Sequence, residues 1–511
     1  MACYLVGCDV GTGGTKAIVI DSDGKFLGGH YIEFGLKTPG HGLAEQDPEW
    51  YWQTVAETIK VSLQKSRINP GDVCGVGLSA QSPACIMVDR DLKPLRDAHI
   101  WMDRRATREC EWLKANIGED AIFELTGNPI DPYYGLTKLM WEKANEPDLY
   151  KRCYKMLNQK DYPLMKLTGK PVTDYSNAAL DGIAFDIRKR CWDQDMVRAI
   201  GLDMDKLPDV YPCDEVIGYV TREAAQATGL VAGTPVVAGT IDANAAWLSM
   251  GVINDGENAL TLGTAACWGL SHKSDKFARG MIVLPHAADS REKYFSAAAL
   301  VAGGALIRWF RDTFGNLERN TGRELGISAY DVMNLEAENI PAGSDGLVIL
   351  PYFMGERTPV WDAHARGVMI GLSLSHGRGH IIRALMEAVG YGVAHNIQLV
   401  RDAGIEVKEP IGLVEGGAKS RLWRQIIADI TGMEAVYMGN VQGAPFGDCV
   451  VAGVGVGVFK NYEFIKDWVS AVERRLPDPE NVARYKELMK VYLGLYPKLK
   501  DDFRTLSRLS A

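Results

Sequence analysis

Cysteine and histidine patterns that bind metals are missing from this sequence of 511 residues. Its ten cysteines include no Cys-x-x-Cys pair, and its nine histidines show no zinc-type spacing. His376 and His380 lie close together, but glycines adjoin them and no acidic ligand is near in sequence. These absences argue against a structural zinc site, and we expect the cysteines to be reduced thiols.

Long hydrophobic runs and clusters of one charge sign are also missing. The longest apolar stretch, residues 450–459, contains three glycines and is too short to cross a bilayer. The net charge is −9 and basic residues are scattered, which argues against nucleic acid or an acidic membrane as the main partner. We expect no signal peptide, since residues 1–9 have neither a charged n-region nor a long apolar run. We therefore expect a cytoplasmic protein with neither nucleic acid nor membrane as partner.

The composition that remains is that of an ordinary globular protein, with 47% hydrophobic and 24% charged residues. A chain of 511 residues is too long for one hydrophobic core, so its length predicts two domains.

A glycine-rich segment near the start, VGCDVGTGGTKAIVI (residues 6–20), lies between two apolar runs. A Walker loop is excluded because Lys16 follows Thr15 and precedes Ala17. A dinucleotide-binding turn, and with it a dehydrogenase, is excluded because a short β-branched strand follows the glycines instead of a helix. The pattern predicts strands at 4–8, 16–20 and 26–34, with the glycines at a hairpin tip whose backbone N–H groups can line an anion site.

Asp9 ends the first of these strands, beside the glycine tip. A carboxylate suits an anion site only when a cation lies between them, and a magnesium nucleotide meets that condition. The alternative is a plain glycine-rich hairpin with a solvated aspartate.

A second segment of the same kind, NALTLGTAACWG (residues 258–269), again reads as strand, Gly-Thr turn and strand. Just before it, a buried strand within 234–241 delivers Asp242, as the first strand delivers Asp9. Two such halves facing each other would place two phosphate-binding turns and two acids around one cleft. The alternative for Asp242 is a helix cap before Ala243.

Other elements follow from hydrophobic periodicity and turn residues. Asp47-Pro48-Glu49 starts a helix that ends near Ser66, and a strand follows at 73–79. Mainly helices are predicted through 105–210, at 381–397, at 450–459 and from Pro479 onward. A strand at 411–414 leads through Gly416 and Gly417 into a helix, which is a place where a base and ribose can approach the backbone.

With these features the chain resembles the FGGY family of carbohydrate kinases, closest to its xylulokinase-like branch. The resemblance covers essentially the whole chain, and the motifs that match are Glu45–Pro48 with Trp50 and Trp52, Trp101–Arg104, Lys160–Tyr162, Gly355–Pro359 and Gly367–Glu387. A further family signature around 133–143 is only approximate, because Gly135 and Glu142 depart from it. The resemblance implies an α/β protein of two ribonuclease-H-like, actin-like ATPase domains, at 1–252 and 253–511, with ATP and Mg²⁺ in the cleft between them.

The resemblance also implies a role for individual residues. Asp242 would be the catalytic base, and Asp9 would hold Mg²⁺ through water. The residues implied to contact the nucleotide or its phosphates are Thr12, Gly13, Gly14, Gly263, Thr264, Gly304, Trp309, Gly417 and Ser420. The residues implied to surround the sugar are Gln81, Ser82, Trp101, Asp103, Asp242 and Ala243. Glu356 and Arg357 either touch ligand or form a structural ion pair.

The resemblance implies ATP-dependent phosphorylation of a hydroxyl on a small sugar, first of all a ketopentose. Xylulokinases, however, carry Gln-Met-His-Gly where this chain has Gln81-Ser82-Pro83-Ala84, and asparagine where Ala243 follows the base. A site that loses hydrogen-bond partners rejects a ligand that needs them, so other acceptors stay open: ribulose, gluconate, a tetritol or autoinducer-2. Arg104 and Arg105 would suit an aldonate carboxylate. A non-catalytic ATP-binding relative and a homodimer also stay open.

Overall fold

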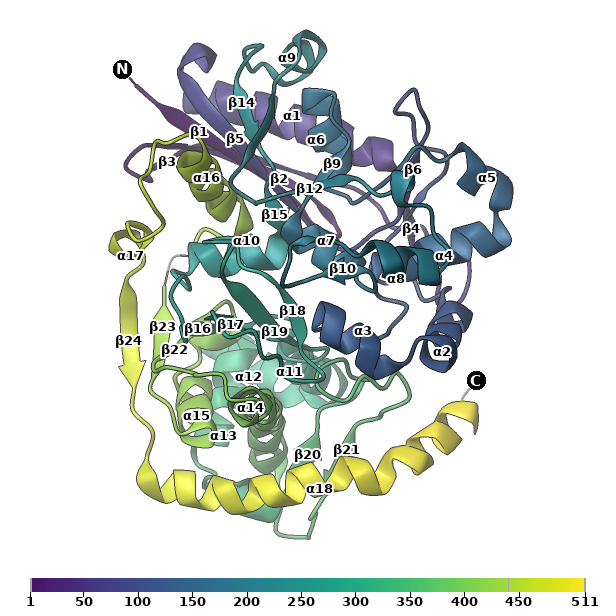
Figure 1. Ribbon diagram of the computed structural model, residues 1–511. Coiled ribbons are helices and arrows are strands. Elements are labelled where there is room, and N and C mark those ends of the chain that lie inside the picture. The colour runs from purple at the N-terminus through teal and green to yellow at the C-terminus, as the bar shows by residue number, and fades with distance from the viewer. Residues whose placement is uncertain (1, 440, 510–511) are drawn as a thin grey trace.

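The computed structural model describes residues 2–439 and 441–509, which form two large sheets with helices around and between them (Figure 1). The first sheet has seven strands in the order β13-β14-β5-β1-β2-β3, with β15 pairing to β5. Its strands are β1 Tyr4–Val10, β2 Gly14–Asp21, β3 Phe26–Glu33, β5 Val73–Ala80, β13 Val216–Tyr219, β14 Pro235–Val237 and β15 Thr240–Ile241. The predicted three-stranded start is confirmed, and Gly24 closes its second turn at φ +77°.

The second sheet also has seven strands, in the order β18-β19-β17-β16-β22-β23-β24. They are β16 Asn258–Leu262, β17 Ala266–His272, β18 Ile282–Pro285, β19 Tyr294–Leu300, β22 Ile411–Val414, β23 Ala435–Met438 and β24 Ala471–Arg475. An antiparallel hairpin, two parallel neighbours and an antiparallel edge strand follow one another in both sheets, as β2-β1-β5-β14-β13 and as β17-β16-β22-β23-β24. The second hairpin is therefore a repeat of the first, as the sequence predicts.

Helix α1 (Pro48–Ser66) starts where the sequence predicts, because the Asp47 carboxylate accepts a hydrogen bond from the Glu49 N–H. Its buried face, with Tyr51, Val55 and Ile59, packs on the first sheet. Around and beyond β5 the chain forms short helices and also several short strands, and the strands within 105–210 interrupt a stretch that the sequence predicts as mainly helical. These helices are α2 Thr107–Asn116, α3 Glu119–Thr126, α4 Gly135–Asn145, α5 Pro147–Arg152, α6 Asp161–Thr168, α7 Tyr175–Asp181, α8 Gln194–Ala199 and α9 Arg222–Thr228. The strands are β4 Glu45–Gln46, β6 Ile86–Val88, β7 Ala98–His99, β8 Lys155–Leu157, β9 Val172–Asp174, β10 Phe185–Asp186, β11 Cys191–Trp192 and β12 Asp209–Tyr211.

The second sheet is accompanied by the helices α11 Gly304–Phe314, α12 Asn316–Leu325, α13 Ala329–Glu338, α14 Arg378–Asp402, α15 Arg421–Thr431, α17 Ile465–Trp468 and α18 Pro479–Leu509, and by the strands β20 Val348–Leu350 and β21 Val368–Ile370. Of these, α14, α15 and α18 confirm helices that the sequence predicts. Helix α18 runs along the lower edge of the molecule in Figure 1.

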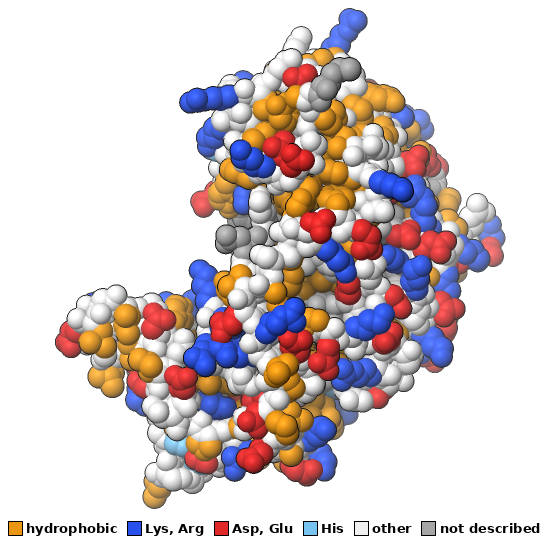
Figure 2. Space-filling view, turned by 90° about the vertical axis from the view of Figure 1, so that its left-hand side faces the viewer, with side chains coloured by type: hydrophobic (Ala, Val, Ile, Leu, Met, Phe, Trp, Pro, Cys, Tyr) orange, Lys and Arg blue, Asp and Glu red, His pale blue; other side chains and the backbone are white. Residues whose placement is uncertain are grey.

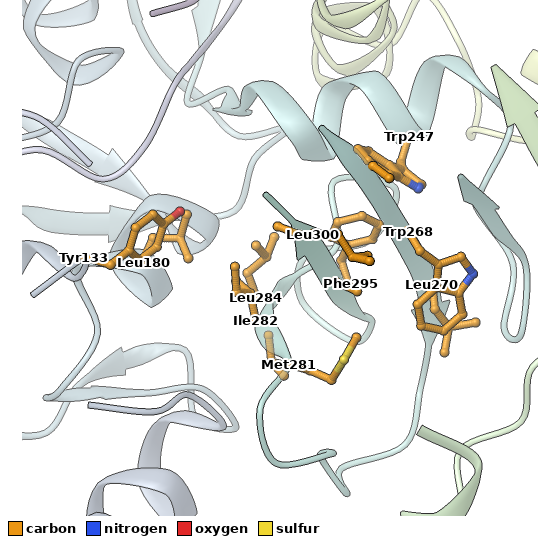
Figure 3. Packing of buried hydrophobic residues seen from close by; sticks show 14 of the residues in the cluster. Tyr133, Leu180, Trp247, Trp268, Leu270, Met281, Ile282, Leu284, Phe295 and Leu300 are labelled. Carbon is orange, nitrogen blue, oxygen red and sulfur yellow. The ribbon is translucent and has the colours of Figure 1, made fainter. Parts of the chain in front are cut away.

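Two helices, α10 (Asp242–Ser249) and α16 (Ala444–Gly455), cross between the sheets. The crossing is close: a Cβ at Gly447 would lie 2.1 Å from the carbonyl oxygen of Ala245. Trp247 ties α10 to the second sheet through a 3.0 Å hydrogen bond to the carbonyl of Ala259, and it packs edge-on against Phe295 in the apolar cluster shown in Figure 3. Helix α16, which covers most of the predicted buried helix at 450–459, packs on β1 and β5 of the first sheet. Each helix thus follows the strands of one sheet and packs on the other.

One pair of cysteines differs from the expected reduced thiols. Cys3 and Cys74, which precede β1 and follow the start of β5, are joined in a disulfide, and the other eight cysteines are free. The expectation of a fully reduced set is therefore wrong for this pair, because the parallel pairing of the two strands brings their first residues together.

The face of the molecule in Figure 2 shows an upper and a lower lobe with an indentation between them at the left edge, and basic and acidic side chains are intermixed over it. Among the described helices, none is long and apolar enough to cross a membrane.

Candidate active site

Asp9, Ser79 and Asp242 lie at or directly after the ends of adjacent parallel strands in the first sheet. Strand β5 lies between β1 and β15, so that Ser79 pairs with Asp9 on one side and with Thr240 on the other. Asp9 is the last residue but one of β1, and Asp242 is the first residue of α10 directly after β15. The structure therefore brings Asp9 and Asp242 to the same edge of one sheet.

The negative charge of Asp9 acts on the Asp242 carboxyl group. Burial raises the pKa of Asp242 to about 7, and the negative charge of Asp9 is the second cause, while a hydrogen bond from the Ala243 N–H opposes the shift. Burial likewise raises the pKa of Asp9 to about 6, against a hydrogen bond from Ser79 and the charge of Lys16. The N-cap of α10 is Ile241, so Asp242 is not the helix cap that the sequence allowed as its alternative role.

The hairpin tip beyond Asp9 is held against the loop that follows β5. The Thr12 hydroxyl donates to Gln81 Oε1 at 2.9 Å and accepts from Trp101 Nε1 at 3.2 Å. Gly13 is exposed, with open space where a Cβ would lie, whereas Gly14 is buried under Tyr31. The expected residues Thr12, Gln81 and Trp101 thus form one connected group.

Further residues adjoin this group. The Ser82 hydroxyl donates to Asn177 Oδ1 at 2.9 Å, and the Ser82 carbonyl accepts from the Tyr133 hydroxyl at 2.9 Å. The guanidinium of Arg357 lies 5.3 Å from the centre of the Trp101 ring. Burial raises the pKa of Tyr133, the positive charge of Arg357 lowers it, and the negative charge of Asp242 raises it. Ala243 is half-buried next to Asp242.

Glu356 and Arg357 do not form the structural ion pair that the sequence allows. Glu356 is buried and accepts hydrogen bonds at Oε1 from the backbone N–H groups of Val301 and Arg357. Among the described residues, no carboxylate forms an ion pair with the Arg357 guanidinium. Arg357 therefore faces the site with its charge unpaired, in line with the other alternative that the sequence allows, contact with a ligand. Sequence reasoning did not place Tyr133 there.

Asp103 is not brought to the pocket. It is fully buried, and its carboxylate accepts from the Ala44 N–H at 2.7 Å and from Arg105 Nε at 2.8 Å. Arg105 also pairs with Glu45, and Arg104 pairs with Asp131. Both arginines are thus already paired with carboxylates of the same half, and neither offers a free charge to a ligand.

A cavity of about 540 Å³ lies against the second hairpin. The tip residues Gly263 and Thr264 are joined to the start of α11, because Gly304 N donates to the Gly263 carbonyl at 2.7 Å. Ser420 caps α15 through the Trp423 N–H and donates to Asn334 Oδ1 at 2.8 Å. Five expected nucleotide contacts line this cavity: Gly263, Thr264, Gly304, Gly417 and Ser420. A cavity of this size is in the range of small-molecule sites.

Trp309 is not among the residues that line the cavity. Its ring packs on Phe353 at 4.9 Å, while Arg308, one position earlier on α11, faces the cavity and donates to Thr264 Oγ1 at 3.1 Å. Sequence reasoning also missed the wall formed around α13, namely Ser328, Tyr330, Asp331 and Asn334. No motif marks that wall; the only signal was the Ser328 capping box at the start of α13.

Two sheets of equal strand order, with acids at the edge of one and a cavity at the hairpin of the other, define a two-domain kinase of the actin-like ATPase fold. Residues 4–249 match the N-terminal domain, and residues 258–456 the C-terminal domain, of the FGGY family of carbohydrate kinases. The chain belongs to this family and is a carbohydrate kinase.

Its relatives include proteins named xylulose kinase and a protein named gluconate kinase. The chain is 29% identical over 502 residues to the xylulose kinase of Bacillus subtilis (strain 168), covering 98% of this chain and 97% of the relative. The crystal structure of xylulose kinase from Rhodospirillum rubrum aligns with a TM-score of 0.89 at 29% identity, covering 98% and 100% of the two chains. That of gluconate kinase from Lactobacillus acidophilus aligns with a TM-score of 0.90 at 26% identity, covering 99% and 100%.

Proposed function

We propose that this kinase transfers the terminal phosphate of ATP to a hydroxyl of a ketopentose, with D-xylulose as the first candidate. The observation that carries the proposal is the meeting of Asp9 and Asp242 at one sheet edge beside the Thr12–Gln81–Trp101 group. The relatives named xylulose kinase supply the choice of sugar.

In this proposal the cavity on the second sheet holds the nucleotide. Gly263 and Thr264 contact the phosphates through backbone N–H groups, while Gly304, Gly417 and Ser420 line the nucleotide. On the opposite side, Thr12, Gly13 and Gly14 receive the phosphate during transfer. Catalysis of this reaction rests mainly on alignment and on compensation of charge, which two facing hairpin tips provide.

The Asp9 site fits Mg²⁺ by its chemistry. Oδ1 accepts from Ser79 at 2.9 Å, and no described residue donates a hydrogen bond to Oδ2. Among the described residues, no group of three or more His, Cys, Asp or Glu side chains could hold a metal alone, and Mg²⁺ typically uses one or two carboxylates plus phosphates and waters. When bound, the ion would neutralise phosphate charge; Asp9 would orient it through water.

Asp242 acts as the general base. Its pKa, raised to about 7, is matched to accepting a proton at neutral pH from the sugar hydroxyl as that hydroxyl attacks. Gln81, Ser82, Trp101 and Ala243 surround the sugar, with Tyr133 and Arg357 as further walls. Asp103 supports this wall from behind by holding Arg105 and the Ala44 backbone.

A second acceptor class, a sugar acid such as gluconate, is favoured by one observation. The Arg357 guanidinium lies at the Trp101 wall with no described carboxylate paired to it, and an arginine in that state suits a ligand carboxylate. The relative named gluconate kinase agrees with this candidate.

We also propose that the two domains divide at residues 252 and 253. The two family matches, which end at 249 and resume at 258, support this boundary. The first domain then carries the sugar site and base, and the second carries the nucleotide cavity.

The test is ADP release measured with ATP, Mg²⁺ and a panel of acceptors: ketopentoses, tetritols, aldonates and hexoses. We expect the highest kcat/KM with D-xylulose, and little ADP release without an acceptor. A clear preference for gluconate would replace the ketopentose by the second candidate. Absence of acceptor-dependent ADP release across the whole panel would refute the proposal and favour a non-catalytic relative.

A further inference from the structure

An acidic side chain from helix α16 enters the site of the first sheet. Asp448 is buried, with 1% of its surface exposed, although it lies 369 residues beyond Ser79 in the chain. The helix that carries it is seated tightly on the first sheet. A Cβ at Gly7 would lie 1.9 Å from the carbonyl oxygen of Pro445, and one at Gly77 would lie 2.2 Å from that of Asp448. The backbone of Asp448 is therefore fixed against β1 and β5.

One hydroxyl joins Asp448 to Asp9. Ser79 Oγ lies 2.8 Å from Asp448 Oδ2 and 2.9 Å from Asp9 Oδ1. A hydroxyl has a single hydrogen, so it can donate to only one of the two carboxyl groups. The other contact is a hydrogen bond only if that carboxyl group carries a hydrogen and donates it to Oγ.

Asp448 is the group that carries this hydrogen. Its Oδ1 is buried with no hydrogen-bond partner among the described residues, and an ionised carboxylate in such a place is strongly disfavoured. Burial raises its pKa well above the usual range, and the charge of Asp9 is the next cause. The hydrogen bonds thus run in one direction, from Asp448 to Ser79 and from Ser79 to Asp9.

From this chain of contacts we propose that Asp448 is a positioning residue, which fixes the Ser79 hydroxyl as a donor to Asp9 and so orients the Asp9 carboxylate toward the phosphates. The inference rests on the proposed function, because it assigns Asp9 to the metal side of the reaction. It adds that the carboxylate on the first sheet is held by a helix that follows the second sheet. Asp9 Oδ1 is thereby kept occupied while Oδ2 stays available.

The experiment compares four variants: Asp448→Ala, Asp448→Asn, Ser79→Ala and the double variant Asp448→Ala/Ser79→Ala. The side-chain amide introduced by Asp448→Asn would keep a hydrogen-bond donor for Ser79, whereas Asp448→Ala removes it. The first readout is the affinity for ADP by calorimetry with Mg²⁺ and with EDTA. The second is the Mg²⁺ concentration that gives half-maximal kinase activity, together with the KM of the sugar.

We expect Asp448→Ala and Ser79→Ala each to reduce the gain in ADP affinity from Mg²⁺ about tenfold, as loss of outer partners of a metal ligand does, with the KM of the sugar nearly unchanged. Asp448→Asn should keep this gain within about twofold. The double variant should be no worse than Ser79→Ala, because both residues act through one hydroxyl.

Asp429 offers a matched control, since it is a buried aspartate of α15 that accepts hydrogen bonds from Gln425 and Asp478. Asp429→Ala should lower Tm and leave the Mg²⁺ gain unchanged. A purely structural Asp448 would give the same result, and that outcome overturns the inference, as would an Asp448→Asn variant as impaired as Asp448→Ala.

If Asp448→Ala does not fold, Ser79→Ala and Asp448→Asn still test the inference. Asp9→Asn separates the two proposals: if it leaves the Mg²⁺ gain intact, the proposed function of Asp9 fails; if it removes the gain while Ser79→Ala does not, only the inference about Asp448 fails.

Discussion

The first and second sheets have the same core strand order, but only the first carries a carboxylate on the strand that leads into its hairpin tip. At the second tip the neighbouring carboxylate is that of Glu415, which follows β22: a Cβ at Gly263 would lie 1.9 Å from its Oε2. Asp9 is the last residue but one of β1, whereas Thr261 holds that position in β16. Conversely, the cavity of about 540 Å³ is lined by the second hairpin and not by the first. One architecture thus carries two tasks, and the difference lies in a few side chains at strand ends and in the helices added beside each sheet.

Removal of the base should break this division of tasks most strongly. Asp242→Asn keeps the shape but cannot accept a proton, so we expect kcat to fall by about 10²–10⁴-fold with ATP affinity unchanged. Steady-state kinetics and calorimetry measure the two quantities. The control is Asp193→Asn, at the cap of α8, which should retain activity. Full turnover in the Asp242 variant would remove Asp242 from its role.

The hairpin positions themselves can be compared next. Asp9→Asn should lower Mg²⁺-dependent activity about 10–100-fold and raise the Mg²⁺ requirement, because an amide holds the hydrated ion less well than a carboxylate. Thr261→Val, at the equivalent position of the second sheet, should change activity less than about twofold, since Thr261 makes one long contact at 3.4 Å. Equal effects at the two positions would contradict the division of tasks.

Acid pH should impair proton transfer at the first sheet and leave nucleotide binding at the second sheet nearly unchanged. A base must be deprotonated, and a pKa raised to about 7 means that Asp242 is increasingly protonated as pH falls below that value. We expect kcat/KM for the sugar to fall about tenfold per pH unit on the acid side, while ATP binding at the second sheet changes little. A rate that stays flat from neutral pH down to the usual range of aspartate would show that no such base limits the reaction.

Filling the cavity should weaken ATP binding at the second sheet and leave sugar binding at the first sheet nearly unchanged. Gly416 has helical backbone angles and open space at its Cβ position, so Gly416→Leu fits the backbone and occupies the cavity. The KM for ATP should rise about tenfold, equivalent to about 1.4 kcal/mol, with the KM for the sugar nearly constant. Gly416→Ala, which adds one methyl group, should have a smaller effect. A rise in the sugar KM alone would place the nucleotide elsewhere.

The sequence predicts the parts of this molecule that depend on local pattern. Both hairpins, the strand before Asp242 and the capped start of α1 follow from periodicity and turn residues, and all are observed. The meeting of Asp9 and Asp242 does not follow from the repeat. The strand before Asp242 joins the first sheet, and its parallel pairing with β5, next to β1, brings both acids to one edge.

The missed residues depend on contacts that local pattern does not encode. Trp309 and Arg308 are neighbours, and only the helix phase set by packing decides which of them faces the cavity. Asp103 lies in a family motif, yet its carboxylate accepts hydrogen bonds from the Ala44 N–H and from Arg105 Nε. Asp448 reaches Ser79 only because α16 crosses to the other sheet.

The most direct test of the account is a crystal structure of the Asp242→Asn variant with Mg²⁺, ATP and the preferred sugar. The account predicts ATP in the cavity of the second sheet, its terminal phosphate between the two hairpin tips, and the reactive sugar hydroxyl within about 2.6–3.2 Å of the side chain at position 242. A sugar bound away from that side chain, or a phosphate that does not reach the Thr12–Gly14 tip, would contradict it.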